Sequence, residues 1–185
     1  MIEIEVKLKE FEKKGLCGKA PFVGRLGPSY LAKANHNFMV SNILWKIGNN
    51  EEAKKVLKLP EDFSAFDWVV ITAYYAMYHS ALATLASIGY KSDNHTATVI
   101  ALEVFFVKKN LLEKKFLDKL KQARELEEEY VQKLRRARRQ RETAQYGVTE
   151  ETGKEAAEKI LKDARNFVNR IEKLINELSS DVVRK

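Results

Sequence analysis

The sequence predicts an all-α protein, an up-and-down bundle of about five long helices plus a short one. Apolar residues recur over long stretches at alternating steps of three and four, the spacing of a helix face packed on a core. Glycine, proline and asparagine stand between these stretches, where helices end. Of the 185 residues, 45% are hydrophobic and 32% are charged, as in ordinary globular proteins. The chain is therefore long enough to form one domain with its own core.

The first predicted helices lie between residues 29 and 57. Ser29 can cap a helix that runs to about Ile47, and Gly48 can end it. A short helix follows at about residues 51–57 and ends before Pro60. The first of these helices is long enough to span the bundle, and the second is too short to do so.

The next predicted helix is expected at the centre of the bundle. It starts at Ser64 or Asp67, runs to Ile88 and stops at Gly89. Between residues 68 and 85 it is apolar almost all round. Such a helix has no polar face to turn towards water, so other helices should cover it on every side.

The remaining predicted helices lie in the second half of the chain. Asp93 or Asn94 caps a segment that ends near Lys109, and Asn110 separates it from a long charged helix at about residues 112–145. A last helix begins at Thr149 and runs to about residue 178. Its apolar stripe consists of Ala157, Ile160, Ala164, Phe167, Ile171, Leu174 and Leu178.

Residues 1–28 are expected to form an N-terminal arm and a Gly/Pro-rich loop, and residues 29–185 the helical domain. Residues 2–8 alternate in polarity, which fits a helical or an extended arm, and no second clear strand exists to pair with it. The Gly18-Lys19-Ala20 segment lacks the hydroxyl residue and spacing of a phosphate-binding loop. A single cysteine, no signal-like segment and no apolar run near the ~20 residues of a membrane span predict a cytoplasmic protein with no membrane part.

The run Lys133-Leu-Arg-Arg-Ala-Arg-Arg-Gln-Arg141 is the strongest functional signal in the sequence. Apolar residues at helical spacing predict the inner face of this helix: Phe116, Leu120, Ala123, Tyr130, Leu134, Ala137 and Ala144. Glu127 and Arg141 share the register of this face, and Arg138 flanks it. A guanidinium on an inner face needs an anion or another acceptor. That acceptor is either a phosphate or a nearby carboxylate such as Glu127 or Glu142.

A second motif lies on the predicted central helix, Tyr74-Tyr75-Ala76-Met77-Tyr78-His79-Ser80-Ala81. Gly89-Tyr90 and His95 follow it, and then the arginines and Tyr146. In this order, the motifs resemble the HEPN family, most closely its small single-domain prokaryotic branch. The resemblance covers roughly residues 30–178 and leaves the first 28 residues without a counterpart.

The resemblance implies a helical bundle that forms a homodimer. Many members of the family are metal-independent ribonucleases, often toxins paired with a nucleotidyltransferase antitoxin. Their signature is an arginine followed a few residues later by a histidine. Arg141 matches the arginine, but Tyr146 stands at the histidine position. Because a tyrosine titrates near ~10 and not near ~6.5, this departure makes proton transfer at neutral pH doubtful.

These observations select the candidate site residues. The catalytic candidates are Arg141, Tyr146 and His79, and the candidates for binding phosphate or nucleic acid are Arg135, Arg138, Arg141, His95 and Tyr75. His79 is either a core histidine satisfied by one hydrogen bond or a group that lines a cleft. The three histidines show no metal-ligand spacing, so no metal or other cofactor is expected.

Three functions stay open from the sequence. The first is a dimer that binds RNA or nucleotide phosphate, with or without cleavage; the net charge of +7 favours a polyanionic partner. The second is a non-catalytic module that works with a nucleotidyltransferase. The third is a helical scaffold whose arginines only neutralise nearby glutamates.

Overall fold

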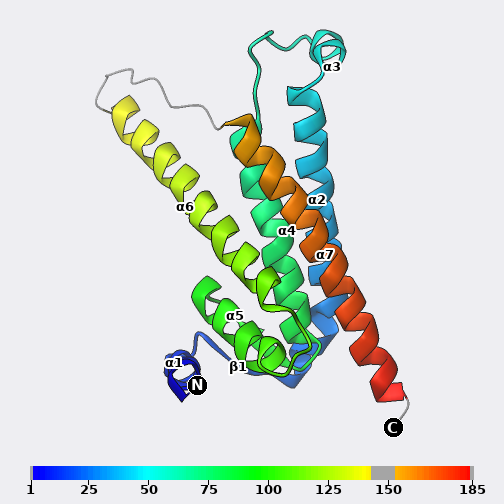
Figure 1. The fold of residues 1–185 in the computed structure, drawn as a ribbon. Coiled ribbons are helices and arrows are strands. Elements are labelled where there is room, and N and C mark those ends of the chain that lie inside the picture. Colours follow the sequence, from blue (N-terminus) through cyan, green and yellow to red (C-terminus); the bar gives the residue numbers. More distant parts are fainter. Residues whose placement is uncertain (1, 143–152, 184–185) are drawn as a thin grey trace.

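The computed structural model describes residues 2–142 and 153–183 and confirms the all-α bundle (Figure 1). Long helices cross the molecule side by side, and a small two-stranded sheet lies near the N-terminal helix. The helices are α1 (Ile2–Lys13), α2 (Gly27–Gly48), α3 (Glu51–Val56), α4 (Phe66–Ala86), α5 (His95–Leu102), α6 (Lys114–Glu142) and α7 (Lys154–Val183).

The central helix of the bundle is α4, as predicted. It packs against α2, α5, α6 and α7, and every residue from Ala76 to Ala86 is buried. Its length and hydropathy would allow it to cross a membrane, which corrects the expectation that no apolar run reaches that length. However, 78% of its most apolar window is buried inside the protein, where a core helix belongs.

Some predicted helix ends are confirmed and others are wrong. Asn94 caps α5, where its side chain accepts a hydrogen bond of 3.0 Å from the backbone N–H of Ala97. Gly48 is the last residue of α2, as predicted. Neither predicted start is correct, because α2 begins at Gly27 and α4 at Phe66. For α2 the reason is Pro28, whose fixed φ suits the first helical turn and removes the need for a serine cap.

The segment after α5 contains an irregular turn. Glu103–Val107 (η2) is π-helical, and the N–H of Lys108 donates to the carbonyl of Glu103. Asn110 then adopts a φ of +57°, which ends the helical path and confirms the predicted break. The turn brings the chain to the start of α6 at Lys114.

The N-terminal arm is helical, so the alternating pattern of its first residues does not mark a strand. In α1, Ile4, Leu8 and Phe11 are the least exposed of the described apolar side chains, at helical spacing. After α1, β1 (Cys17–Lys19) pairs antiparallel with β2 (Tyr90–Ser92), and η1 (Pro21–Leu26) leads into α2. Neither strand was predictable, because three residues are too few to show a period of two.

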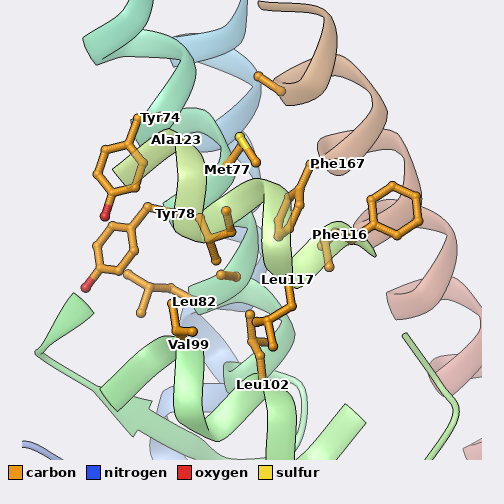
Figure 2. Close-up of a cluster of buried hydrophobic side chains, with 14 of the residues drawn as sticks. Tyr74, Met77, Tyr78, Leu82, Val99, Leu102, Phe116, Leu117, Ala123 and Phe167 are labelled. Atoms are coloured by element: carbon orange, nitrogen blue, oxygen red, sulfur yellow. The ribbon is translucent and has the colours of Figure 1, made fainter. Parts of the chain in front are cut away.

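The core lies between α4, α5, α6 and α7 (Figure 2). In α6, Phe116, Leu120, Ala123 and Glu127 are all buried, which confirms the predicted inner face over this part of the helix. Tyr74 and Tyr78 lie at one side of the cluster, with their hydroxyl groups pointing away from Met77 and Phe167 (Figure 2). These two tyrosines belong to the candidate site.

Candidate functional site

The arginine run occupies the last turns of α6, whose backbone is helical as far as Glu142. Figure 1 shows that this end of α6 (yellow) stands apart from α4 and α7. The side chains of Arg135, Arg138 and Arg141 lie outside the described residues, and so does the whole of Tyr146. The burial expected for Arg141 therefore stays a prediction.

The backbone of α6 nevertheless decides which carboxylates can reach Arg141. Glu127 is 8% exposed and lies fourteen residues before Arg141. At a rise of 1.5 Å per residue, their backbones are about 21 Å apart, too far for an ion pair within one chain. Glu142 is the next residue along the helix, and adjacent residues do not face each other. Neither proposed carboxylate is therefore a suitable partner for Arg141 within its own helix.

The structure brings three predicted site residues together elsewhere. Tyr75, His79 and His95 belong to one group with Tyr74 and Tyr78, which we call the Tyr–His cluster. Four of these residues project from α4, and His95 is the first residue of α5. The ring centroid of Tyr75 lies 6.0 Å from that of His79 and 6.4 Å from that of His95.

His95 is fixed by two tyrosines. Its Nδ1 atom forms a hydrogen bond with the hydroxyl of Tyr74. Its ring stacks on Tyr78, with a centroid distance of 4.0 Å and an interplanar angle of 8°. Burial lowers the pKa of His95, and the nearby charge of Arg124 lowers it further. The imidazole is therefore neutral at pH 7.

His79 is fixed by the backbone of its own helix. Its Nδ1 atom lies 2.7 Å from the carbonyl oxygen of Tyr75 and 3.1 Å from the Asn37 carboxamide nitrogen. A carbonyl can only accept and a carboxamide nitrogen can only donate, so the two contacts need opposite tautomers of His79. The shorter contact, to the Tyr75 carbonyl, favours the tautomer with the hydrogen on Nδ1 and the lone pair on Nε2. Burial lowers the pKa of His79, which is thus also neutral at pH 7.

The second ring nitrogen of each histidine is open to solvent. Within residues 2–142 and 153–183, no hydrogen bond engages Nε2 of His79 or of His95. The single buried side-chain nitrogen or oxygen without a partner in those ranges is Nη1 of Arg170. Because neither Nε2 atom is buried and unpaired, both can reach a ligand.

Three residues at this site, Tyr74, Tyr78 and Arg124, are not among the predicted site residues. Tyr74 is buried, which raises its pKa and keeps the phenol protonated. Arg124 of α6 donates to Oγ1 of Thr96 at 2.7 Å and to Oε1 of Glu128 at 2.9 Å. Tyr74 and Tyr78 lie in the motif that suggested the family, but their spacing indicated core positions. Nothing in the sequence distinguishes Arg124 from its charged neighbours.

A groove of about 690 Å³ lies beside the cluster, between α1, α5 and α6. Thr96 and Arg124 form part of its wall, and Ile4 and Ile100 contribute apolar surface. Its charged side chains include ion pairs such as Lys121 with Glu103 and Arg124 with Glu128. With basic and acidic residues both present, this groove does not provide a cationic surface for a polyanion.

The described residues offer no metal site. No three His, Cys, Asp or Glu side chains in them come together in a way that could hold a metal ion. His79 and His95 instead contact a backbone carbonyl and a phenol, and His36 is exposed on α2. The chemistry of the Tyr–His cluster is accordingly that of neutral imidazoles and phenols.

Comparison with known proteins decides the family. The HEPN domain family matches this chain over residues 49–174. The chain belongs to the HEPN family. A UPF0332 protein of Archaeoglobus fulgidus is 30% identical over 128 residues, which cover 69% of this chain and 86% of that protein. The HEPN match includes α4, α5, α6 and most of α7, and hence both the Tyr–His cluster and the arginine run.

Proposed function

We propose that this HEPN protein is a dimer that binds RNA or nucleotide phosphate through Arg135, Arg138 and Arg141 of α6. The observation that carries the proposal is the charge pattern of this helix. Residues 133–141 contain six Lys and Arg side chains and no acidic residue. On a helix, side chains meet partners three or four residues away, and at these spacings Arg135 and Arg141 have no acidic neighbour.

The three arginines are spaced at steps of three residues and therefore form one row along α6. A guanidinium presents several N–H donors in a plane that matches the oxygens of a phosphate. A row of such groups suits the repeated phosphates of a nucleic-acid strand. The net charge of +7 also favours a polyanionic ligand.

The proposed dimer is supported by an apolar face of α2. Met39 and Ile43 are 53% and 49% exposed. They lie opposite Ser41, whose hydroxyl donates to the carbonyl of Val69 and marks the side of α2 that packs on α4. The charged residues of α2 are only Lys33 and Lys46. We propose that a second copy of the chain covers this face in a two-fold dimer.

Cleavage is a separate part of the proposal. The 2′-hydroxyl oxygen of the RNA would attack the adjacent phosphorus and give its proton to the neutral imidazole of His79. The bond to the 5′ oxygen would then break, and that oxygen would take up a proton from the hydroxyl of Tyr146. Arg141 would stabilise the additional negative charge of the transition state. Tyr146 in place of a histidine makes binding the better supported function.

Binding is tested with a short single-stranded RNA and an oligonucleotide of the same sequence with an uncharged backbone. We expect the RNA to bind, with an affinity that falls steeply as salt rises, and the uncharged oligonucleotide to bind much more weakly. Equal binding of the two would contradict phosphate recognition. If neither binds, the alternatives are a module for a nucleotidyltransferase partner or a helical scaffold.

A further inference from the structure

We infer that the Tyr–His cluster is a nucleobase-binding subsite, in which a base stacks on Tyr75 and its edge is held by His79 and His95. The inference rests on the proposed function and extends it. The arginines of α6 would hold the phosphates of a strand, and the cluster would hold one of its bases.

The ring of Tyr75 differs from its neighbours because no ring among the described residues stacks on it. Tyr74, Tyr78 and His95 stack on one another, with interplanar angles of 19°, 21° and 8°. Tyr75 meets Tyr74 at 63° and both Tyr78 and His95 at 82°. Its smallest angle to a neighbouring ring is 35°, with His79. In the described part of the chain, no ring lies parallel to this partly exposed tyrosine, so its face can accept a base.

The two histidines provide complementary polar groups beside that face. Nε2 of His79 carries the lone pair, because its Nδ1 donates to the carbonyl of Tyr75. Nδ1 of His95 is the partner that the described residues offer to the buried, protonated hydroxyl of Tyr74. The hydroxyl therefore donates to Nδ1, which leaves the hydrogen of His95 on Nε2. One open acceptor and one open donor therefore flank Tyr75. The Watson–Crick edge of every nucleobase presents both kinds of group.

The local charges favour a base over a phosphate at this position. Both imidazoles are neutral at pH 7, as described above. Burial raises the pKa of Tyr75, and the charge of Glu127 raises it further. Neutral imidazoles and protonated phenols offer no ion pair to a phosphate, whereas they can form hydrogen bonds with a neutral base.

The two halves of the site are also within reach of one strand. Arg124 of α6 donates to Thr96, the residue after His95, so it marks the level of the cluster along that helix. Arg135 follows eleven residues later, about 16 Å further along the axis. A strand of a few nucleotides spans this distance. Its base would lie on Tyr75 and its neighbouring phosphates beside Arg135 and Arg138.

The experiment compares a six-nucleotide single-stranded RNA with an abasic strand of the same sugar–phosphate length. For the wild-type protein, we expect the RNA to bind about five- to 150-fold more tightly than the abasic strand, the range found for one stacked base. Tyr75→Leu should lose most of this preference, and Tyr75→Phe should keep it. Trp68→Ala is the matched control, because it removes an exposed aromatic side chain from the same helix.

Circular dichroism of each variant establishes that it is folded. The polar contacts are tested with His79→Asn and His95→Asn, which should reduce the preference for the RNA, against His36→Asn, which should not. Equal wild-type affinity for the two strands would overturn the inference and leave phosphate binding intact. Full preference in Tyr75→Leu would overturn it too. If neither strand binds to the wild-type protein, the proposed function itself fails.

Discussion

At the scale of single residues, buried His79 and partly buried His95 make stability depend on pH. Their folded-state pKa values lie below the unfolded value of about 6.5. Below about pH 6.5 the unfolded chain therefore binds more protons than the folded one. The contribution of the two histidines to the free energy of unfolding should be complete above about pH 6.5. The free energy of unfolding should fall as the pH drops from 6.5 towards 5. Urea denaturation from pH 5 to 8 measures this, and the double variant His79→Asn/His95→Asn should flatten the curve. His36→Asn should leave it unchanged.

The arginines of α6 should differ from one another in their contribution to RNA binding. Arg141→Ala should weaken binding to single-stranded RNA about ten- to one-hundredfold, the loss of a desolvated charge-assisted contact worth roughly 1.5–3 kcal/mol. Arg136→Ala should cost less, because Arg136 lies outside the row formed by Arg135, Arg138 and Arg141 and would give up one screened phosphate contact. Fluorescence anisotropy titrations at two salt concentrations compare the two variants. Equal effects would mean that the run acts only as a charged surface.

Part of the candidate site could be predicted from the sequence. Tyr75, His79 and His95 could be selected because they share a motif or a helix start, and the structure places them in one cluster. The orientation of each imidazole could not be predicted. It depends on the Tyr74 hydroxyl and on the position of the Tyr75 carbonyl, which only the packed helices define. Arg124 meets Thr96 across two helices, a contact that no sequence spacing reveals.

At the scale of elements, the cap of α5 stabilises the start of the helix and also positions a residue of the Tyr–His cluster. Asn94 satisfies the N–H of Ala97 and so positions His95, the next residue. Asn94→Ala should destabilise the protein by about 0.5–2 kcal/mol. This corresponds to roughly 2–4 °C in Tm for each kcal/mol in a chain of this size. Asn166→Ala, on the exposed side of α7, is the control and should not lower Tm. The same loss in both variants would contradict the capping role.

Most helices could be predicted from the sequence, because the helical spacing of apolar residues and the positions of Gly, Pro and Asn indicate the same segments. The arm was the exception. Alternation over residues 2–8 suits a strand, yet α1 places Ile4, Leu8 and Phe11 at helical spacing against the body of the protein. Tertiary packing decides between the two, and a local pattern does not contain that information.

At the scale of the whole molecule, a dimer formed through α2 makes a prediction about mass. Small-angle scattering or light scattering at micromolar concentration should give the mass of two chains. Ile43→Lys should shift it towards one chain by placing a charge in the apolar face. Val56→Lys, at a position of α3 that is 74% exposed, should leave the dimer intact. A wild-type protein with the mass of one chain would refute the dimer.

If the protein cleaves RNA, the reaction should persist in chelator and should require Arg141. The candidates for moving protons are His79 and Tyr146, so no step of the proposed reaction uses a metal ion. A labelled single-stranded RNA incubated with the wild-type protein and with Arg141→Ala, each with and without chelator, measures this. Loss of cleavage in chelator would mean that a metal ion takes part. Unchanged cleavage by Arg141→Ala would remove Arg141 from the reaction.

The pairing of β1 with β2 has a consequence for synthesis on the ribosome. Cys17 and Tyr90 meet across 73 residues of sequence. At translation rates of about 5–20 residues per second, the partner strand follows β1 after roughly 4–15 seconds. During that time the sheet cannot form, and the apolar side chains of α1 have no α5 to pack on. Helix α1 and strand β1 therefore wait for their partners throughout this time, and factors that bind nascent chains can reach them.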